Sequence, residues 1–230
     1  MIRPRAAPAG PAAYLPAGRL GHVVIGGLGL NALLAWLEIV GIYTFLERVW
    51  RGLAGRFVGP ETLDAHWAEV EMLRRLHGGV WIATAVVFLV WLHRAYRNLP
   101  ALGITEPRFT PRAAVSAFVV PVLNIIVPVR VVRDLWNGSD PSRARGGDGP
   151  GRTSPWVAWW WGLFVASALL DPVVLRLAGN LHARLTIGTT VVLVLAQLLE
   201  MAAAILAMGV VWFVSQGQQE IVGRENDALP

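Results

Sequence analysis

Apolar residues fall into five long blocks along the chain, separated by polar segments rich in arginine, glycine and proline. Several blocks approach or exceed the roughly 20 residues that a helix needs to cross a hydrocarbon core of about 30 Å. This pattern predicts an all-α fold, a polytopic membrane helical bundle. The expected spans lie at about 20–46, 79–98, 113–136, 155–178 and 185–215.

The polar segments predict the rest of the domain organisation. A single membrane domain is expected over residues 20–216, after a flexible cytoplasmic tail at 1–19 that is rich in proline and alanine. A polar C-terminal tail is expected at 217–230. The glycine, proline and serine content of residues 138–154 predicts a flexible loop between the third and fourth blocks.

An amphipathic helix is expected over residues 61–77, outside the membrane. Apolar residues recur there at helical spacing, namely Leu63, Trp67, Val70 and Leu73. The acids come early and the bases late, which complements the helix dipole. The Gly78–Gly79 pair is expected to separate this helix from the second span.

The third block carries two prolines and an amide in an otherwise apolar segment. On a continuous helix, Pro121, Asn124 and Pro128 lie on one stripe. Each proline leaves a carbonyl without its donor, which is costly in hydrocarbon, so this face must meet protein or water. Two interpretations follow: a kinked helix satisfied by its neighbours, or a broken, re-entrant element near a ligand or ion path.

Composition agrees with a membrane protein and restricts the partners. Hydrophobic residues make up 55% of the chain and charged residues 15%, and there is no cysteine. All 20 basic residues are arginines, spread over the boundaries of the apolar blocks. We therefore expect contacts with the lipid bilayer and its anionic head groups, and exclude nucleic acid as a partner.

The positions of the arginines favour one topology over another. If all five blocks cross, the arginines divide almost evenly between the two sides. If the third block dips in and returns, thirteen arginines lie on the inner side and seven on the outer side. Four full spans plus one broken or re-entrant segment, with both termini cytoplasmic, is thus the preferred arrangement, and five spans is the alternative.

Polar residues gather at the predicted cytoplasmic boundary of the second and third blocks. Several are four residues apart, the spacing of local helical pairs. Arginines from both blocks would form a cationic rim that anchors the protein to lipid or binds an anionic ligand or partner. The candidates are Arg94, Arg97, Asn98, Asn124, Arg130, Arg133, Asp134 and Asp140.

A second set of polar side chains lies inside the apolar blocks. Glu38 shares a stripe with Asn31 in the first block, and Glu200 lies beside Gln197 in the last block. Glu200 continues a face of alanines that favours close helix packing, so we expect it to point into the bundle. A buried carboxylate there is either paired structurally or part of a proton or cation path.

One segment resembles a known family. RAYRNLPALG at 94–103, followed by FTPRAAVSAFVVPVLNIIVPVRVVRDLWNGSDP at 109–141, is similar to the bacterial membrane proteins grouped as domain of unknown function 4328. The similar features are an R-A-x-x-N motif, a P-x-x-N-x-x-x-P block and a W-x-x-S-D-P turn. The resemblance implies a multi-pass protein of the bacterial inner membrane and supplies no reaction.

The chain offers no recognisable catalytic set. No nucleophile has a base at useful spacing, and no metal-ligand pattern or nucleotide-binding motif occurs, so we expect no catalytic residues, metal or cofactor. The favoured hypothesis is a non-enzymatic bundle that senses, scaffolds or binds, with a membrane-protein partner or a second copy as its further partner. The alternative is a transporter or channel for a small solute, protons or ions that uses the intramembrane carboxylates.

Overall fold

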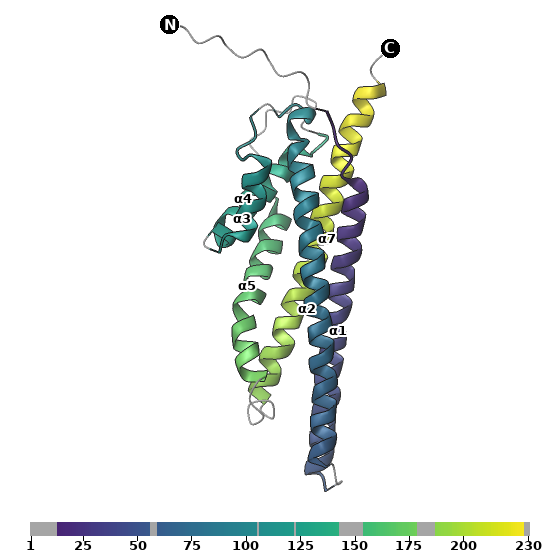
Figure 1. The fold of residues 1–230 in the computed structure, drawn as a ribbon, viewed down its shortest axis with the longest axis vertical. Coiled ribbons are helices and arrows are strands. Elements are labelled where there is room, and N and C mark those ends of the chain that lie inside the picture. Colours follow the sequence, from purple (N-terminus) through teal and green to yellow (C-terminus); the bar gives the residue numbers. More distant parts are fainter. Residues whose placement is uncertain are drawn as a thin grey trace. The chain divides into compact units, whose positions relative to one another are not determined.

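A computed structural model describes residues 13–55, 59–104, 106–121, 123–142, 154–178 and 187–227. None of these residues forms a strand, which confirms the all-α prediction. Figure 1 shows the order of the elements. They are α1 (Gly18–Leu53), α2 (Pro60–Arg97), the short 3-10 helix η1 (Leu99–Leu102), α3 (Pro111–Val119), α4 (Leu123–Gly138), α5 (Pro155–Ala178) and α7 (Ile187–Asp227).

Three of the described helices are long and apolar enough to cross a membrane, and they lie at Gly18–Gly52, Glu61–Arg97 and Gly188–Arg224. Large apolar side chains stand exposed along them, including Leu33, Ile82 and Ile205. Exposed apolar surface of this extent is what a bilayer would cover. The chain is therefore a membrane helical bundle, while the predicted fourth and fifth spans stay predictions.

The chain divides into two compact units. Unit 1 comprises Met1–Val23, Val87–Ser154 and Val210–Pro230, and unit 2 comprises Val24–Val86 and Pro155–Gly209. The helices α1, α2 and α7 each contribute residues to both units. Each unit has its own buried residues, described in turn below.

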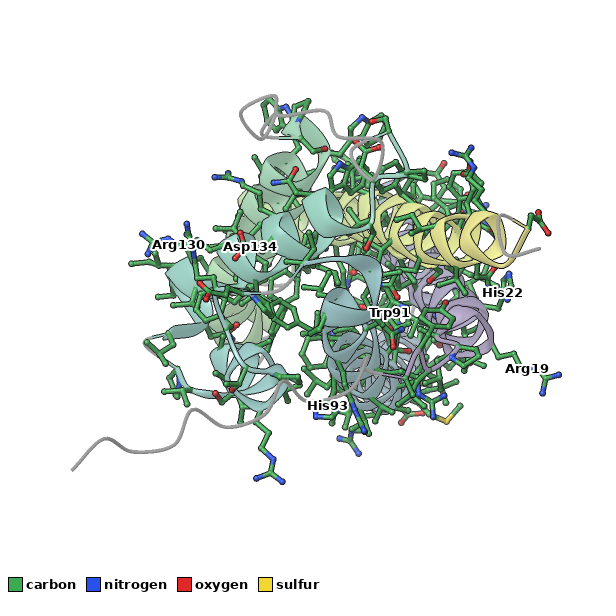
Figure 2. All side chains as sticks on the ribbon, turned by 90° about the horizontal axis from the view of Figure 1, so that it is seen from above. Arg19, His22, Trp91, His93, Arg130 and Asp134 are labelled. Carbon is green, nitrogen blue, oxygen red and sulfur yellow. The ribbon has the colours of Figure 1, made fainter. Side chains whose placement is uncertain are left out.

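Unit 1 is built around the C-terminal end of α2. Trp91, Leu92 and Tyr96 are completely buried, with Leu135 of α4 and Val214 of α7. Trp136 stacks on Phe213, with 3.8 Å between the ring centroids. In Figure 2, Trp91 points inward, and Arg130 and Asp134 lie at the edge of the unit.

Unit 2 has a core of aliphatic and aromatic side chains from α1, α2 and α7. It contains Ile42, Phe45, Trp67, Leu193 and Ala196. The alanine face predicted on the last span is buried, at Ala196, Ala203, Ala204 and Ala207. Small residues on this face allow helix backbones to approach closely.

The prediction that Gly78 and Gly79 separate two helices is wrong. Both glycines lie inside α2, which therefore joins the predicted amphipathic helix and the second span. Glycine costs a helix interior only about 1 kcal/mol relative to alanine. Contacts on either side of the pair hold α2 to α1, at His77 and at Thr84.

The predicted polar tail at 217–230 is helical as far as Asp227. Gln218 and Ile221 are buried, so this part of α7 packs like the rest of the helix. An ion pair between Glu220 and Arg224, one turn apart, adds local support.

The third apolar block contains the expected break, at Pro121. α3 ends at Val119, and Val120 is extended, as a residue before proline prefers to be. The chain then resumes as α4, which packs against α3. Pro121 is exposed between the helices, so the stripe predicted for Pro121, Asn124 and Pro128 does not exist. Pro128 alone lies inside a helix, where it is buried.

Candidate functional site: a buried carboxylate and imidazole cluster

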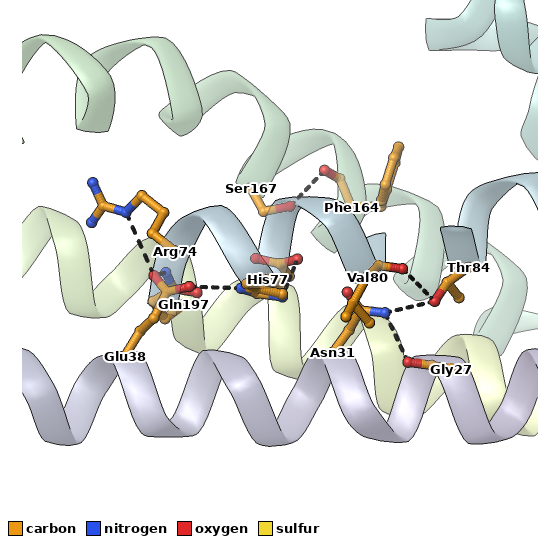
Figure 3. Close-up of polar contacts among 11 residues, drawn as sticks. Gly27, Asn31, Glu38, Arg74, His77, Val80, Thr84, Phe164, Ser167 and Gln197 are labelled. Carbon is orange, nitrogen blue, oxygen red and sulfur yellow. Dashed lines mark hydrogen bonds and ion pairs between the residues drawn. The ribbon is translucent and has the colours of Figure 1, made fainter. Parts of the chain in front are cut away.

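Five polar side chains from three helices meet inside unit 2, and Figure 3 labels four of them, Glu38, Arg74, His77 and Gln197. Glu38 comes from α1, Arg74 and His77 come from α2, and Gln197 and Glu200 come from α7. We call this group the Glu38 cluster. The Glu38 side chain is completely buried, so its charge depends on these neighbours rather than on water.

His77 stands between two carboxylates. Its Nδ1 atom is 2.8 Å from Glu38 Oε1, and its Nε2 atom is 3.4 Å from Glu200 Oε1. The first contact is a hydrogen bond, and the second is a longer ion-pair contact. An imidazole placed in this way can bind a proton that both carboxylates stabilise.

The second oxygen of Glu38 meets two donors. Arg74 Nε lies 3.6 Å from Oε2, and the Gln197 amide donates a hydrogen bond to the same oxygen. Arg74 Nη2 and Gln197 Oε1 are buried without a hydrogen-bond partner in the described part of the chain. Polar atoms of this kind are the usual partners of buried water.

The proton on His77 sets the formal charge of the cluster. If both carboxyl groups are ionised and the imidazole is neutral, the two carboxylates and the Arg74 guanidinium leave one net negative charge. With a protonated imidazole, the charges balance. Because an uncompensated charge is costly inside a protein, the arrangement of these side chains matters for the stability of unit 2.

Antiparallel pairing of α1 and α2 places these side chains opposite each other. Asn31 lies two turns before Glu38 on α1, and Thr84 lies two turns after His77 on α2. The Asn31 side-chain amide donates a hydrogen bond to Thr84 Oγ1 at 3.0 Å. Asn31 also donates to the Gly27 carbonyl at 2.7 Å. A Cβ atom at Gly27 would lie 2.7 Å from Thr84 Oγ1, so glycine is what permits the helices to approach here.

A second polar group lies in the other direction along the same helices. The His66 ring contacts Glu69 through Nδ1 and Thr44 Oγ1 through Nε2, each at 3.0 Å. His66 is buried, and Glu69 is largely exposed. This group belongs to the charged half of α2, which also contains Glu61, Asp64, Glu71, Arg74 and Arg75.

The Glu38 cluster therefore lies where the charged half of α2 gives way to its apolar half. Residues 78–92 of α2 contain no titratable side chain, and neither do residues 23–37 of α1 or 201–219 of α7. Charged side chains avoid hydrocarbon. The cluster thus lies at one end of the apolar part of α2, while the uncharged runs at 39–46 of α1 and 187–196 of α7 continue past it.

Three of the four intramembrane candidates meet in this site, namely Glu38, Gln197 and Glu200, and Asn31 lies two turns away. Sequence reasoning missed His77 and Arg74, which it placed on an extramembrane helix. A signal existed, because a buried carboxylate needs a cationic or donor partner. His77 and Arg74 are among the basic residues beside the apolar part of the second block, with Arg75 and, at its other end, His93 and Arg94.

In unit 1, the candidate Asn98 joins separate chain segments. Its Oδ1 accepts from the Leu15 amide at 3.0 Å, and its Nδ2 donates to the Leu15 carbonyl and to Gln218 Oε1. Gln218 Nε2 in turn donates to the Ala95 carbonyl and to Ser139 Oγ. We call these side chains the Asn98 network. Asn98 is completely buried, so this arrangement is structural.

The other rim candidates are placed separately. Arg94 donates to the Pro16 carbonyl at 3.3 Å, and Arg97 and Arg130 are exposed. Figure 2 places Arg130 and Asp134 together on α4, away from Arg19 and His22. Asn124 and Arg133 are half-buried.

The two acids of the rim have local partners. Asp134 pairs with Arg108, at 3.8 Å, rather than with Arg130 four residues away. Burial raises the pKa of the Asp134 carboxyl, against the lowering effects of Arg108 and Arg133. Asp140 accepts hydrogen bonds from the backbone and hydroxyl of Ser142, which closes the turn after α4.

Fold and site together define a membrane helical bundle with a titratable polar cluster in its interior. The chain belongs to the family described as Domain of unknown function (DUF4328), whose model matches residues 55–216. This confirms the resemblance seen in the sequence. The matched region contains Arg74, His77, Gln197 and Glu200, while Glu38 precedes it. No curated protein and no solved structure matches the chain.

Proposed function

We propose that this protein is a non-enzymatic membrane sensor of proton concentration. The observation that carries the proposal is the position of His77 between Glu38 and Glu200, which joins three helices through one titratable ring. When His77 is protonated, both carboxylates attract it and the charges of the cluster balance. When it loses the proton, a net negative charge stays in the interior, and α1, α2 and α7 separate or admit water.

Sensing fits the distribution of titratable groups better than transport does. A proton carried across the bilayer needs groups along the whole path, and the apolar parts of α1, α2 and α7 contain none beyond the Glu38 cluster. Proton or ion transport is the second candidate function. The observation in its favour is that Asn31 and Thr84 extend the line of polar contacts two turns further.

The proposed topology has four spans in the bacterial inner membrane, formed by α1, α2, α5 and α7, with both termini cytoplasmic. α3 and α4 have 9 and 16 residues, fewer than the roughly 20 that a span requires. This supports an α3–α4 segment that dips in or lies at the interface. Exposed arginines such as Arg97 and Arg130 would contact anionic head groups. In this topology the cluster faces the extracytoplasmic side.

Single cysteines can test the topology, because the natural chain has none. Asp64 and Ser142 are exposed and lie on opposite sides in the proposed arrangement. A membrane-impermeant thiol reagent is expected to label Asp64→Cys in intact cells and to label Ser142→Cys only after lysis. Labelling of Ser142→Cys in intact cells would contradict the arrangement.

The sensing proposal is tested by a distance measurement within unit 2. Spin labels at Tyr43→Cys on α1 and Leu195→Cys on α7 would be placed on exposed positions. We expect the distance distribution to change between about pH 5 and 8, the range in which histidine titrates. His77→Gln is expected to abolish the change, and His93→Gln, in unit 1, serves as the matched control.

Two results would contradict sensing by this cluster: an unchanged distance in the natural sequence, or a change that survives His77→Gln. The transport alternative is tested with a pH-sensitive dye inside proteoliposomes. Transport predicts a proton flux that Glu200→Gln reduces, whereas sensing predicts no flux in either protein.

A further inference from the structure

The group formed by His66 and Glu69 extends from the surface of α2 into the core of unit 2. The Glu69 side chain is 74% exposed, and the His66 side chain is 9% exposed. His66 Nδ1 faces Glu69, and Nε2 faces the opposite way, toward Thr44 Oγ1 and the Gly41 carbonyl of α1, the latter at 3.3 Å. The ring thus has one nitrogen toward solvent and one toward α1.

The two titratable sites share one face of α2. His66, Val70, Arg74 and His77 follow each other at spacings of four, four and three residues, one turn at each step. On α1, Gly41 and Glu38 are likewise one turn apart. A proton at His66 is therefore about three turns, or roughly 16 Å, from His77 along the helix axis.

An apolar contact stands between the two sites. Val70 is buried and packs directly on α1, because Gly41 has no side chain to keep it away. A Cβ atom at Gly41 would lie 3.1 Å from Val70 Cγ2. This contact interrupts the row of polar side chains between His66 and Arg74, because the Val70 side chain has no group that can carry a proton.

We propose that His66 and Glu69 form the port through which protons reach the Glu38 cluster, and that Val70 against Gly41 is the barrier controlling their passage. Glu69 passes a proton from water to His66 Nδ1, and His66 releases the proton on Nε2. A transient chain of water past Val70 then carries the proton to His77. This inference rests on the proposed function and adds its route.

Among the described residues, those that face His66 are the following. Glu69 shares its helix, Thr44 and Phe45 face it from α1, and the α7 residues in this part of the core are Leu193 and Ala196, which carry no charge. Leu170 of α5 packs against the same core; residues 155–170 contain no charged side chain, and Asp171 is the next residue in the sequence. The competing route is direct exchange at Glu200, whose side chain is 27% exposed.

Exchange of the His77 imidazole N–H with water measures the route directly. The purified full chain in lipid nanodiscs would be labelled with ¹⁵N-histidine, and the His77 signal among the five histidines would be assigned with His77→Gln. Val70→Ala removes two methyl groups from the barrier and is expected to speed the exchange by about tenfold. Val86→Ala, at an exposed position of the same helix, is the matched control and should leave it unchanged.

The port is tested with variants that should slow the exchange of the His77 imidazole N–H with water. Glu69→Gln and His66→Gln are each expected to slow it several-fold, and Glu69→Gln changes only an exposed side chain, so the fold is retained. If neither variant slows the exchange and Val70→Ala matches Val86→Ala, the port and barrier are disproved. A pH-dependent change of the Tyr43–Leu195 distance would in that case still support sensing, with Glu200 as the route.

Discussion

The two units contain polar networks of opposite character. The Asn98 network of unit 1 consists of amides, a hydroxyl and backbone groups, and both amide side chains have donors matched to acceptors. The Glu38 cluster of unit 2 combines four charged or titratable side chains with the Gln197 amide, and among the described residues Arg74 Nη2 and Gln197 Oε1 have no hydrogen-bond partner. The first network contains no titratable side chain, and the second contains four, Glu38, Arg74, His77 and Glu200.

This difference separates a structural role from a responsive one. Satisfied neutral networks rigidify a protein and specify one arrangement. A buried group of charges is stable in one protonation state and strained in another. We therefore expect unit 1 to be insensitive to pH through its network, and unit 2 to contain the response.

The largest expected effect comes from removing the central carboxylate. Glu38→Ala leaves Arg74 and His77 without their shared partner, and breaking a buried pair costs about 3–5 kcal/mol. Glu38→Gln should cost less, because the amide keeps hydrogen-bonding capacity. Equilibrium unfolding in detergent micelles measures both effects.

The control for this prediction lies on the same helix. Glu47 pairs with Arg51 one turn away on the surface, so Glu47→Ala should change the unfolding free energy by less than about 0.5 kcal/mol. Equal losses for Glu38→Ala and Glu47→Ala would show that the buried cluster contributes nothing special.

The next effect tests the neutral network. Asn98→Ala removes three hydrogen bonds and leaves the acceptor of Gln218 and the backbone of Leu15 unpaired. We expect a loss of about 2–4 kcal/mol in unfolding free energy. The loss should be the same between about pH 5 and 8, since no member of the network titrates there.

Asn137→Ala provides the matched asparagine control, because Asn137 is only half-buried on α4. Its effect should stay within about 0.5 kcal/mol. A loss for Asn98→Ala that varies with pH would remove the distinction between the two networks.

A smaller loss of unfolding free energy is expected at Gly217, where two backbone segments approach each other closely beside the Asn98 network. A Cβ atom at Gly217 would lie 1.9 Å from the Ser139 carbonyl oxygen, so Gly217→Ala must displace the backbone around Ser139. Such overpacking costs about 1–3 kcal/mol. A Cβ atom at Gly223 on the same helix meets nothing within 4 Å, and Gly223→Ala should instead stabilise by up to about 1 kcal/mol. The difference in unfolding free energy between the variants is the measurement.

Hydrophobic pattern was enough to predict the helical class and the approximate positions of α1, α5 and α7, because long apolar runs in lipid must form helices. It did not predict that α2 continues through Gly78 and Gly79, since the stabilising contacts come from α1. The same reason explains the missed partners of Glu38. A buried carboxylate signals that a cation is nearby, but the register of α1 against α2 decides which one. That register depends on tertiary contacts such as Asn31 with Thr84.

The smallest effect concerns Asp134, a half-buried acid outside the three long apolar helices. Its pKa is raised because burial disfavours the charged form, and Arg108, 66% exposed, compensates only weakly. A folded-state pKa above the unfolded value means that the stability contribution is complete at low pH and is lost as the pH rises through the folded pKa. Asp134→Asn should therefore stabilise the protein at neutral pH, by at most about 1 kcal/mol.

The gain from Asp134→Asn should shrink toward zero as the pH falls below about 3, under the ordinary aspartate pKa, where the natural carboxyl is protonated in both states. Asp140→Asn is the matched control, and it should destabilise slightly because its carboxylate accepts two hydrogen bonds from Ser142. If Asp134→Asn destabilises at neutral pH, the ion pair with Arg108 outweighs burial. Unit 1 would then contain a stabilising charge of its own, and the contrast with the Glu38 cluster would rest on the Asn98 network alone.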